Sequence, residues 1–321
     1  MTRILAAFFI ALLSVGNAFA QAQYPNKPIK LVVGFAAGGI SDVLARALAI
    51  SLTRQIGQQV IVENKTGAGT TIAGDYVARS APDGYTLWLQ DITTHAINNN
   101  LYAKLPYDSI KDFTYIAMVA STPLMLVVHP STNVHSVKEL IALLKASPGK
   151  YSYGSSGNGT IVHLAGEMLR GAAGVEVQHV PYKGSNPATQ AILGGEVTFV
   201  FSTMPPAIAN AKAGKLRALA VTTPKRVSAA PDVPTMAEAG VPDLEIVLYS
   251  GILSAKGMEP ALVRRINAEF AKVVQAPEIR QVYDNIGADP IAMTPQEFEA
   301  ATQREIAKLG PVVKASGARI E

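Results

Sequence analysis

The feature that most constrains the fold is a regular alternation of short Val-, Ile- and Leu-rich runs with longer segments whose apolar residues recur at helical spacing. This alternation is typical of an α/β protein with mainly parallel sheets flanked by helices. The predicted strands are Ile29–Val33, Val60–Glu63, Thr86–Leu89, Tyr115–Val119, Leu124–Val128, Val197–Phe201, Leu216–Val221 and Ile246–Ser250. The predicted helices are Ser41–Ile56, Thr71–Ser80, Val137–Ala146, Thr160–Gly171, Asn186–Leu193, Pro205–Ala213, Glu259–Ala276, Pro277–Ile286 and Thr294–Ala315.

Two segments are expected to cross between two lobes. A strand within Ala120–Val128 would enter the second lobe, and a strand within Glu245–Leu253 would return to the first, which the helical tail completes. Two crossing strands of this kind would form a hinge between the lobes, and ligands commonly bind in the cleft between such lobes. A single larger sheet would fit the periodicity nearly as well. We expect lobe 1 to span residues 24–122 plus 250–321, and lobe 2 residues 123–249.

The N-terminus has the features of a secretory signal peptide. Arg3 precedes an apolar core, Ile4–Val15, and the stretch ends in the small-x-small sequence Ala18-Phe19-Ala20. The alternative is a membrane anchor, for which this stretch is short. We therefore expect residues 1–20 to be a signal peptide cleaved after Ala20, and the mature protein to be periplasmic.

Composition argues against several classes of partner. The chain has no cysteine, and its formal charge of +4 becomes +3 once Arg3 is removed. It has no dense Lys/Arg block or aromatic-rich basic surface, so nucleic acid is not an expected partner. Nothing indicates an obligate assembly, and we expect a monomer.

The run from Leu31 to Asp42 predicts a buried strand, a small-residue loop and the start of a helix. Backbone N–H groups at such a helix start can bind an anion, because glycines let the ligand approach the main chain. Ser41 or Asp42 can cap the helix. The simpler interpretation is an ordinary strand-to-helix turn.

Similar small polar loops recur at other predicted strand ends. They are Thr93-Thr94-His95, Tyr153–Thr160, Val180–Ala188 and the stretch from Phe201 to Pro206. Lys183, in the third of these, could meet an anion or simply be a solvated lysine. Because several strand ends lead through small polar residues into helices, we expect a cleft lined with neutral hydrogen-bond donors.

Other chemistries fit the sequence less well. The nucleophile-elbow pattern G-x-S-x-G is absent around Ser155 and Ser156, although a secreted serine hydrolase using one of them remains an alternative. The stretch from Gly67 to Gly74 lacks the spacing of a dinucleotide loop, so no cofactor is expected and a turn with close helix packing is favoured. His163 and Glu167 are only half of a metal pattern, and we expect no metal site.

Many ordered motifs make the chain resemble the Bug (TctC-like) family, the extracytoplasmic solute-binding proteins of tripartite tricarboxylate transporters. The resemblance covers nearly the whole mature chain. Its motifs are Gly34–Asp42 with Ala45-Arg46, Glu63–Gly69, Ala81–Thr86, Tyr153–Thr160 with His163-Leu164, Val180–Ala188, Gly214–Ala220, Pro231–Thr235 and Glu238-Ala239-Gly240.

The resemblance implies a type II-like, two-lobe periplasmic binding protein without enzymatic activity. Such a protein closes around a small carboxylate and delivers it to a membrane permease. The resemblance further implies that the first loop holds a ligand carboxylate through backbone N–H groups and bridging waters, while the second lobe discriminates among ligands. With the loops chosen above, the candidate ligand-binding residues are Phe35, Ala37, Gly38, Gly39, Ile40, Ser41, Asp42, Thr93, Thr94, Ser155, Ser156, Asn158, Gly159, Thr160, Lys183, Gly184, Ser185, Ser202 and Tyr249.

This chain departs from the usual family pattern at three places. It has Ala36-Ala37 where many members have Ala-Pro, Ser202 where many have Asp, and Tyr249 where a Trp is frequent. Ser202 cannot pair with a ligand ammonium, so we expect a di- or tricarboxylate or an aromatic carboxylate rather than an acidic amino acid. A ligand-sensing module that contacts a membrane partner is a further alternative.

Overall fold

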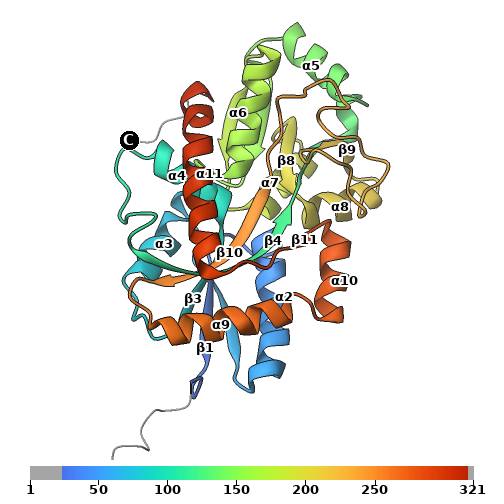
Figure 1. Ribbon diagram of the computed structural model, residues 1–321. Helices are drawn as coiled ribbons and strands as arrows, with labels where there is room; N and C mark the ends of the chain where they lie inside the picture. Colours follow the sequence, from blue (N-terminus) through green and yellow to red (C-terminus); the bar gives the residue numbers. More distant parts are fainter. Residues whose placement is uncertain (1–23, 317–321) are drawn as a thin grey trace, which may run out of the picture.

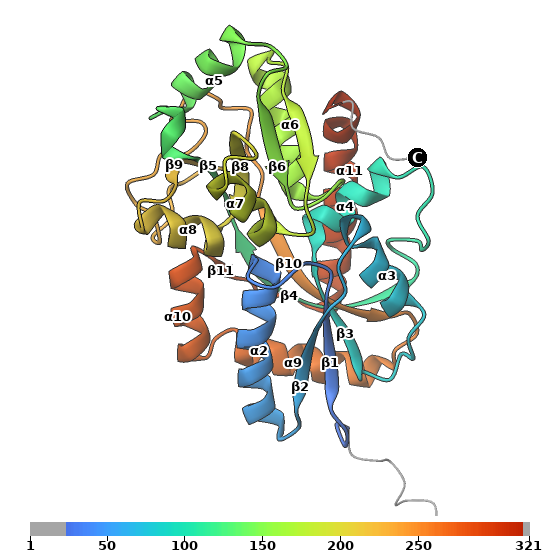
Figure 2. The ribbon, with the colours of Figure 1, turned by 180° about the vertical axis from the view of Figure 1, so that it is seen from behind.

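Strands and helices alternate along residues 24–316, the part of the chain that the computed structural model describes, and they assemble into two sheets (Figure 1). The predicted signal peptide lies outside the described residues. The sheets form two lobes, with β1–β4, β10 and β11 in one and β5–β9 in the other (Figure 2). None of the described helices is both long and apolar enough to cross a membrane.

The sheet of the first lobe has six strands in the order β11-β4-β10-β3-β1-β2. Strands β1, β2 and β3 are parallel, whereas β10 runs antiparallel to both β3 and β4. Leu31, Val32 and Val33 of β1 are fully buried, as expected for a central strand covered by helices on both faces. The bounds are β1 Ile29–Val33, β2 Val60–Asn64, β3 Thr86–Asp91, β4 Phe113–Thr122, β10 Leu248–Ala255 and β11 Asp289–Pro290.

The sheet of the second lobe has five strands in the order β7-β6-β8-β5-β9. Strands β6, β7 and β8 are parallel, and β5 is antiparallel to β8 and β9. Each sheet therefore has three neighbouring parallel strands, and the strands beyond them join through antiparallel pairs. The bounds are β5 Leu124–Val128, β6 Ser152–Ser155, β7 Gln178–Pro181, β8 Phe199–Thr203 and β9 Arg217–Val221.

The chain crosses between the lobes twice. Only Pro123 separates the end of β4 from the start of β5, and residues 222–247 lead back from β9 to β10. The Leu124 N–H donates to Thr222 Oγ1 at 2.9 Å, and the Thr222 N–H donates to the Leu124 carbonyl at 3.0 Å, so the two crossings are joined. The α/β two-lobe fold is confirmed. The exact lobe boundaries stay a prediction.

Within residues 24–316, ten α-helices flank the sheets. Helix α11 runs beside α4 and reaches α6, so the C-terminal tail touches both lobes (Figure 1). The bounds are α2 Ile40–Ile56, α3 Thr71–Ala78, α4 Ile92–Leu101, α5 Val137–Ala146, α6 Ile161–Ala173, α7 Ser185–Leu193, α8 Met204–Lys212, α9 Pro260–Val273, α10 Pro277–Ile286 and α11 Pro295–Ser316.

Four elements were not predicted from the sequence. Helix α4 is rich in Thr and Asn, which are weak helix formers, and it depends on Asp91, whose side chain accepts the Thr94 N–H at the N-cap. Strands β6, β7 and β11 contain Gly, Gln, His or Pro and lack an apolar alternation. Their strand conformation comes from pairing with neighbours in the sheet.

The core of the second lobe contains a stack of aromatic rings with two histidines. The His163 and His179 rings lie 4.1 Å apart, and the Tyr153 ring stacks on His179 at 4.9 Å. Burial, and then the neighbouring His163, lower the pKa of His179 to about 3. Burial also lowers the pKa of His163. Both rings are therefore neutral in the folded protein at ordinary pH.

This stack predicts a loss of stability in acid that depends on His179. Below its ordinary pKa of 6.5 the unfolded chain binds a proton at His179 that the folded chain does not bind, so the free energy of unfolding falls from that pH towards about 3. His179→Gln should flatten this fall when unfolding by urea is measured from pH 7 to pH 4. The change in slope should stay below the one-proton limit of about 1.4 kcal/mol per pH unit, because solvent partly screens the ring.

Ser155→Ala is the matched control for that experiment. It removes the hydrogen bond between Ser155 Oγ and His179 Nε2, which are 2.6 Å apart, but keeps the imidazole. It should lower stability and retain the wild-type pH slope. Equal slopes in wild type and His179→Gln would contradict the prediction.

Candidate functional site

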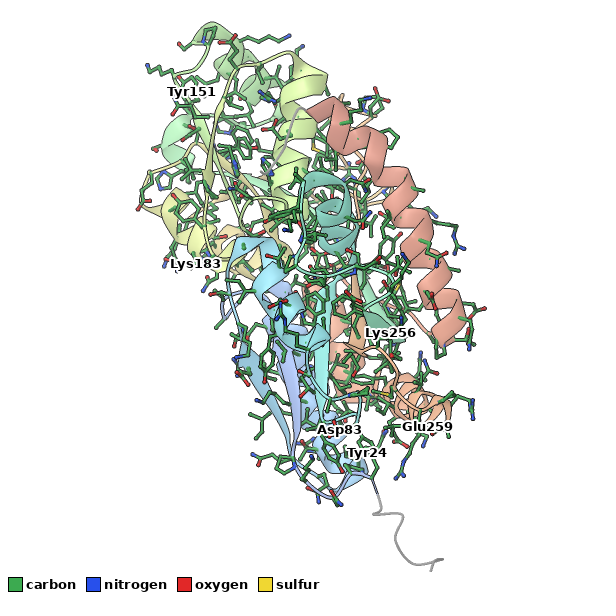
Figure 3. The ribbon with its side chains drawn as sticks, turned by 90° about the vertical axis from the view of Figure 1, so that its left-hand side faces the viewer. Tyr24, Asp83, Tyr151, Lys183, Lys256 and Glu259 are labelled. Atoms are coloured by element: carbon green, nitrogen blue, oxygen red, sulfur yellow. The ribbon has the colours of Figure 1, made fainter. Side chains whose placement is uncertain are left out.

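A cavity of about 390 Å³ lies between the two lobes. The first lobe contributes the start of the β1–α2 loop, the turn before α3 and Tyr102, and the second lobe contributes the loops that follow β6 and β7. Lys183 lies where the two lobes meet (Figure 3). The lining residues are Gly34, Phe35, Gly67, Ala68, Gly69, Thr70, Tyr102, Ser156, Gly157, Asn158, Pro181, Tyr182 and Lys183.

The β1–α2 loop is held by a polar clamp behind it. Asp42 accepts the Gly38 N–H at 3.0 Å, and Arg46 donates to both carboxylate oxygens of Asp42 at 2.8 and 3.0 Å. Asn64 donates to the Phe35 carbonyl at 2.8 Å and to Asp42 Oδ1 at 3.0 Å. Burial alone would raise the pKa of Asp42, but the hydrogen bonds from Arg46, Gly38 and Asn64 outweigh it and lower this pKa. Asp42 therefore positions the loop as an ionised carboxylate.

The expected capping of α2 is wrong in detail. The N-cap is Gly39 and makes no side-chain hydrogen bond, while Asp42 reaches back to Gly38 instead. The Ser41 hydroxyl is buried and has no hydrogen-bond partner among the described residues. Since the first N–H groups of a helix lack intrahelical acceptors, the start of α2 offers donors to an external acceptor.

Helix α7 of the second lobe presents a similar N-terminus to the same loop. Its N-cap is Gly184, again without a side-chain hydrogen bond, and the buried Ser185 hydroxyl has no hydrogen-bond partner within the described part of the chain. The lobes touch here, because the Ala36 N–H donates to the Lys183 carbonyl at 3.1 Å and Asn186 Nδ2 donates to the Ala37 carbonyl at 3.3 Å. Two uncapped helix N-termini from different lobes thus lie close together.

The turn before α3 carries four consecutive residues with positive φ, the first of which is Gly67 with φ of 128°. Ala68, Gly69 and Thr70 have φ of 45°, 57° and 78°. Side chains of α4 and its C-terminal neighbour hold this turn, since Asn98 donates to the Gly69 carbonyl at 2.7 Å and the Tyr102 hydroxyl donates to the Ala68 carbonyl at 2.9 Å. Such strained backbone persists only where the surroundings support it, and it is common at binding sites.

Gly69 also meets the opposite lobe. A Cβ at this position would lie 2.3 Å from the Asn158 carbonyl oxygen, which is much closer than any real contact. The two lobes therefore approach through bare backbone at Gly69, and no other residue fits there without moving them apart.

Thr93 and Thr94 act at the junction of the lobes. Thr93 Oγ1 donates to the Val247 carbonyl at 2.9 Å and so holds the returning crossing segment. Thr94 Oγ1 bonds to the buried Asp91 and accepts the Ile161 N–H of α6 at 3.1 Å. Burial raises the pKa of Asp91 to about 7, against the lowering effect of its hydrogen bonds with Thr94. Both threonines have structural partners.

The loop after β6 is ordered by its own hydroxyls. Ser156 Oγ donates to Thr160 Oγ1 at 2.9 Å, and Thr160 donates to the Gly157 carbonyl at 2.8 Å while accepting the His163 N–H as the N-cap of α6. The Gly159 N–H donates to His163 Nδ1 at 3.2 Å. This network directs Ser156 and Asn158 to the cavity.

Ser155 contacts His179 but lacks the arrangement of a catalytic nucleophile. Ser155 is fully buried. Its Oγ also accepts a hydrogen bond from the Gly157 N–H at 3.1 Å, so this N–H is not free to serve in an oxyanion hole. The His179 ring is oriented by stacking contacts with the His163 and Tyr153 rings, whereas a catalytic histidine is oriented by a carboxylate. The pair stabilises the loop.

The remaining candidates lie away from the cavity lining. Ser202 is fully buried, with its hydroxyl 2.9 Å from Thr189 Oγ1, and so ties β8 to α7. Tyr249 is half-buried on β10, opposite Ser121, and burial raises its pKa. In the described residues no group of three or more His, Cys, Asp or Glu side chains could hold a metal ion.

The cavity therefore brings Phe35, Ser156, Asn158 and Lys183 together from two lobes. The residues from Ala37 to Asp42, with Gly184 and Ser185, form the opposed helix N-termini beside it. Sequence reasoning left out the Gly67–Thr70 turn and Tyr102. The glycines of that turn were visible in the sequence, but local spacing could not reveal what they face.

Comparison with known proteins is consistent across sequence and structure. The family model described as tripartite tricarboxylate transporter family receptor matches residues 44–318. Protein BugT of Bordetella pertussis is 35% identical over 324 residues, covering 100% of this chain and 99% of BugT.

Two solved structures show the same fold with ligands. An R. palustris protein with adipate is 34% identical with a TM-score of 0.89, over 92% of this chain and 100% of the other. MatC from Rhodopseudomonas palustris with bound malate is 28% identical with a TM-score of 0.86, over 90% of this chain and 100% of MatC. This chain belongs to the tripartite tricarboxylate transporter receptor family, whose members are solute-binding receptors and not enzymes.

Proposed function

We propose that this protein binds a small carboxylate between its lobes in the periplasm and delivers it to a tripartite tricarboxylate-type membrane permease. The observation that carries this proposal is the pair of uncapped N-termini of α2 and α7, which meet across the cleft. Helix N-termini attract anions through their free N–H groups and dipoles. A ligand that touches both lobes favours the closed state.

The ligand class follows from the charges at the site. Asp42 is the acidic residue in the first turn of α2. Its carboxylate already accepts hydrogen bonds from Arg46, Gly38 and Asn64. Ser202 offers only a hydroxyl, which is buried. Neither position therefore offers a free carboxylate to a ligand ammonium. We propose a di- or tricarboxylate or an aromatic carboxylate, in keeping with the adipate and malate in related structures.

The size of the cavity suits such a ligand. A volume of about 390 Å³ lies within the usual range for small-molecule sites. Each charge-assisted hydrogen bond contributes roughly 1.5–3 kcal/mol, so several of them approach the roughly 8 kcal/mol of micromolar affinity. The neutral donors avoid the desolvation cost of a buried counter-charge. A sensory role would use the same site.

A panel of acids tests the proposed ligand class by thermal shift and calorimetry. Adipate, malate, citrate and benzoate are compared with aspartate and glutamate. At a hundred times its Kd, a bound acid stabilises the protein by about 2.7 kcal/mol, and we expect a rise in Tm with at least one of the first four. A response to aspartate or glutamate alone would contradict the ligand class, and no response to any organic acid would contradict carboxylate binding.

Gly69→Ala should weaken binding of the acid identified in that panel by at least about tenfold, which is about 1.4 kcal/mol. The added methyl group meets the Asn158 carbonyl, so the lobes cannot reach the closed arrangement. Isothermal titration calorimetry measures the change in Kd.

The matched control is Gly57→Ala. Gly57 has a similar φ of 70°, but a Cβ added there would have no atom within 4 Å. This variant therefore has the same cost of placing alanine in a left-handed backbone conformation, about 1 kcal/mol, without a clash between the lobes. Its Kd should equal that of wild type. Equal Kd values for both variants would show that closure at Gly69 does not govern binding.

A further inference from the structure

Three buried hydroxyl groups where the lobes meet have no hydrogen-bond partner among residues 24–316. They belong to Ser41, Ser185 and Thr203, which are 1%, 3% and 4% exposed. Each stands at the start of a different helix, because Ser41 lies in the first turn of α2, Ser185 in the first turn of α7, and Thr203 at the N-cap of α8. Buried polar groups in folded proteins nearly always have a partner, so three exceptions of one kind require an explanation.

The sequence of α8 explains why the Thr203 hydroxyl is free. A threonine at an N-cap normally accepts a hydrogen bond from the N–H of the second or third helical residue. In α8 these residues are Pro205 and Pro206, which have no N–H group. Thr203 therefore makes no side-chain cap in its own helix, and its hydroxyl is available to a group from outside the helix.

The start of α8 lies beside the starts of α2 and α7. A Cβ built on Gly39, the N-cap of α2, would be 4.0 Å from Thr203 Oγ1. Thr189 Oγ1 of α7 donates to the Ser185 carbonyl at 2.8 Å and lies 2.9 Å from Ser202 Oγ of β8. Ser202 directly precedes Thr203, so α7 and α8 begin side by side. Both helices lie above the end of α2 at which that helix begins (Figure 2).

A carboxylate suits the chemistry of this place. Each unpartnered hydroxyl can donate one hydrogen bond, and the first N–H groups of α2 and α7 are further donors. The N-termini of helices also carry positive potential. The first turns of α7 and α8 contain no acidic residue, and Asp42 in the first turn of α2 is ion-paired with Arg46. The donors of three helices therefore face a common point without a competing free carboxylate in their first turns.

We infer that the hydroxyls of Ser41, Ser185 and Thr203 form a subsite for one carboxylate group of the bound acid, and that Thr203 is a specificity-determining residue of this subsite. Ser41 belongs to the first lobe and the other two residues to the second, so the subsite is complete only when the lobes are closed. An acid bound there favours the closed state. This inference rests on the proposed function, because it names residues that recognise the carboxylate.

Calorimetry with adipate, malate, citrate and benzoate tests the subsite. Thr203→Val replaces the hydroxyl by a methyl group of the same shape. It should weaken binding of each of these acids that wild type binds by at least about tenfold, because one hydrogen bond to a charged group is lost. Thr203→Ser keeps a hydroxyl, and its Kd should stay within about threefold of wild type.

Thr114→Val is the matched control. Thr114 Oγ1 donates to the Ala255 carbonyl at 3.0 Å, near the end of β4 that lies away from the crossing to the second lobe. This variant also loses a threonine hydroxyl, but its Kd for the same acids should equal that of wild type.

Melting of the protein without any acid gives a second measurement. Thr203→Val removes a hydroxyl that has no partner, so its Tm should equal or exceed that of wild type, whereas Thr114→Val loses a hydrogen bond and should have a lower Tm. A lower Tm for Thr203→Val would assign its hydroxyl a structural role and overturn the inference. An unchanged Kd for Thr203→Val would also overturn it, with water alone bonded to the hydroxyls, while the proposed function stands. If wild type binds none of the acids, both fail.

Discussion

The interaction on which this structure depends is the meeting of two uncapped helix N-termini across the cleft. Helices α2 and α7 each begin after a glycine that supplies no side-chain cap. Asp91, Ser136 and Thr160 cap α4, α5 and α6 with their side chains, whereas α3, α8 and α10 also begin without a side-chain cap. Donors left free at an interlobe contact provide positive potential without a charged side chain.

Side chains around the cleft mainly hold backbone in place. Asp42 and Asn64 fix the first loop, Asn98 and Tyr102 fix the strained turn before α3, and Thr160 orders the loop after β6. The backbones of the two lobes can then approach each other most closely at glycines. The lobes reach van der Waals contact at Gly69 and Gly184, where a larger residue would keep them apart.

The two lobes are coupled by hydrogen bonds between them in addition to one hydrophobic cluster that includes residues of both lobes. The crossings meet at Leu124 and Thr222, and the direct bonds across the cleft include the Ile161 N–H to Thr94 and the Ala36 N–H to the Lys183 carbonyl. Individual bonds of this kind contribute only about 1 kcal/mol each. A ligand with several charge-assisted hydrogen bonds to both lobes can therefore shift the equilibrium from the open to the closed state.

The sequence by itself determined the α/β class, and its family resemblance gave the two-lobe plan, whereas anion binding by the β1–α2 loop stays a prediction. Periodicity and glycine spacing are local properties, so Ile29–Val33, Leu124–Val128 and Pro277–Ile286 match the observed elements. The predicted set of ligand-binding residues stays a prediction. Only the tertiary structure placed Gly69 against Asn158, Ser155 against His179 and Arg46 behind Asp42 and Asn64. Most of these contacts join separate strands or lobes, and they depend on how the sheets pair and close, which local spacing along one chain does not encode.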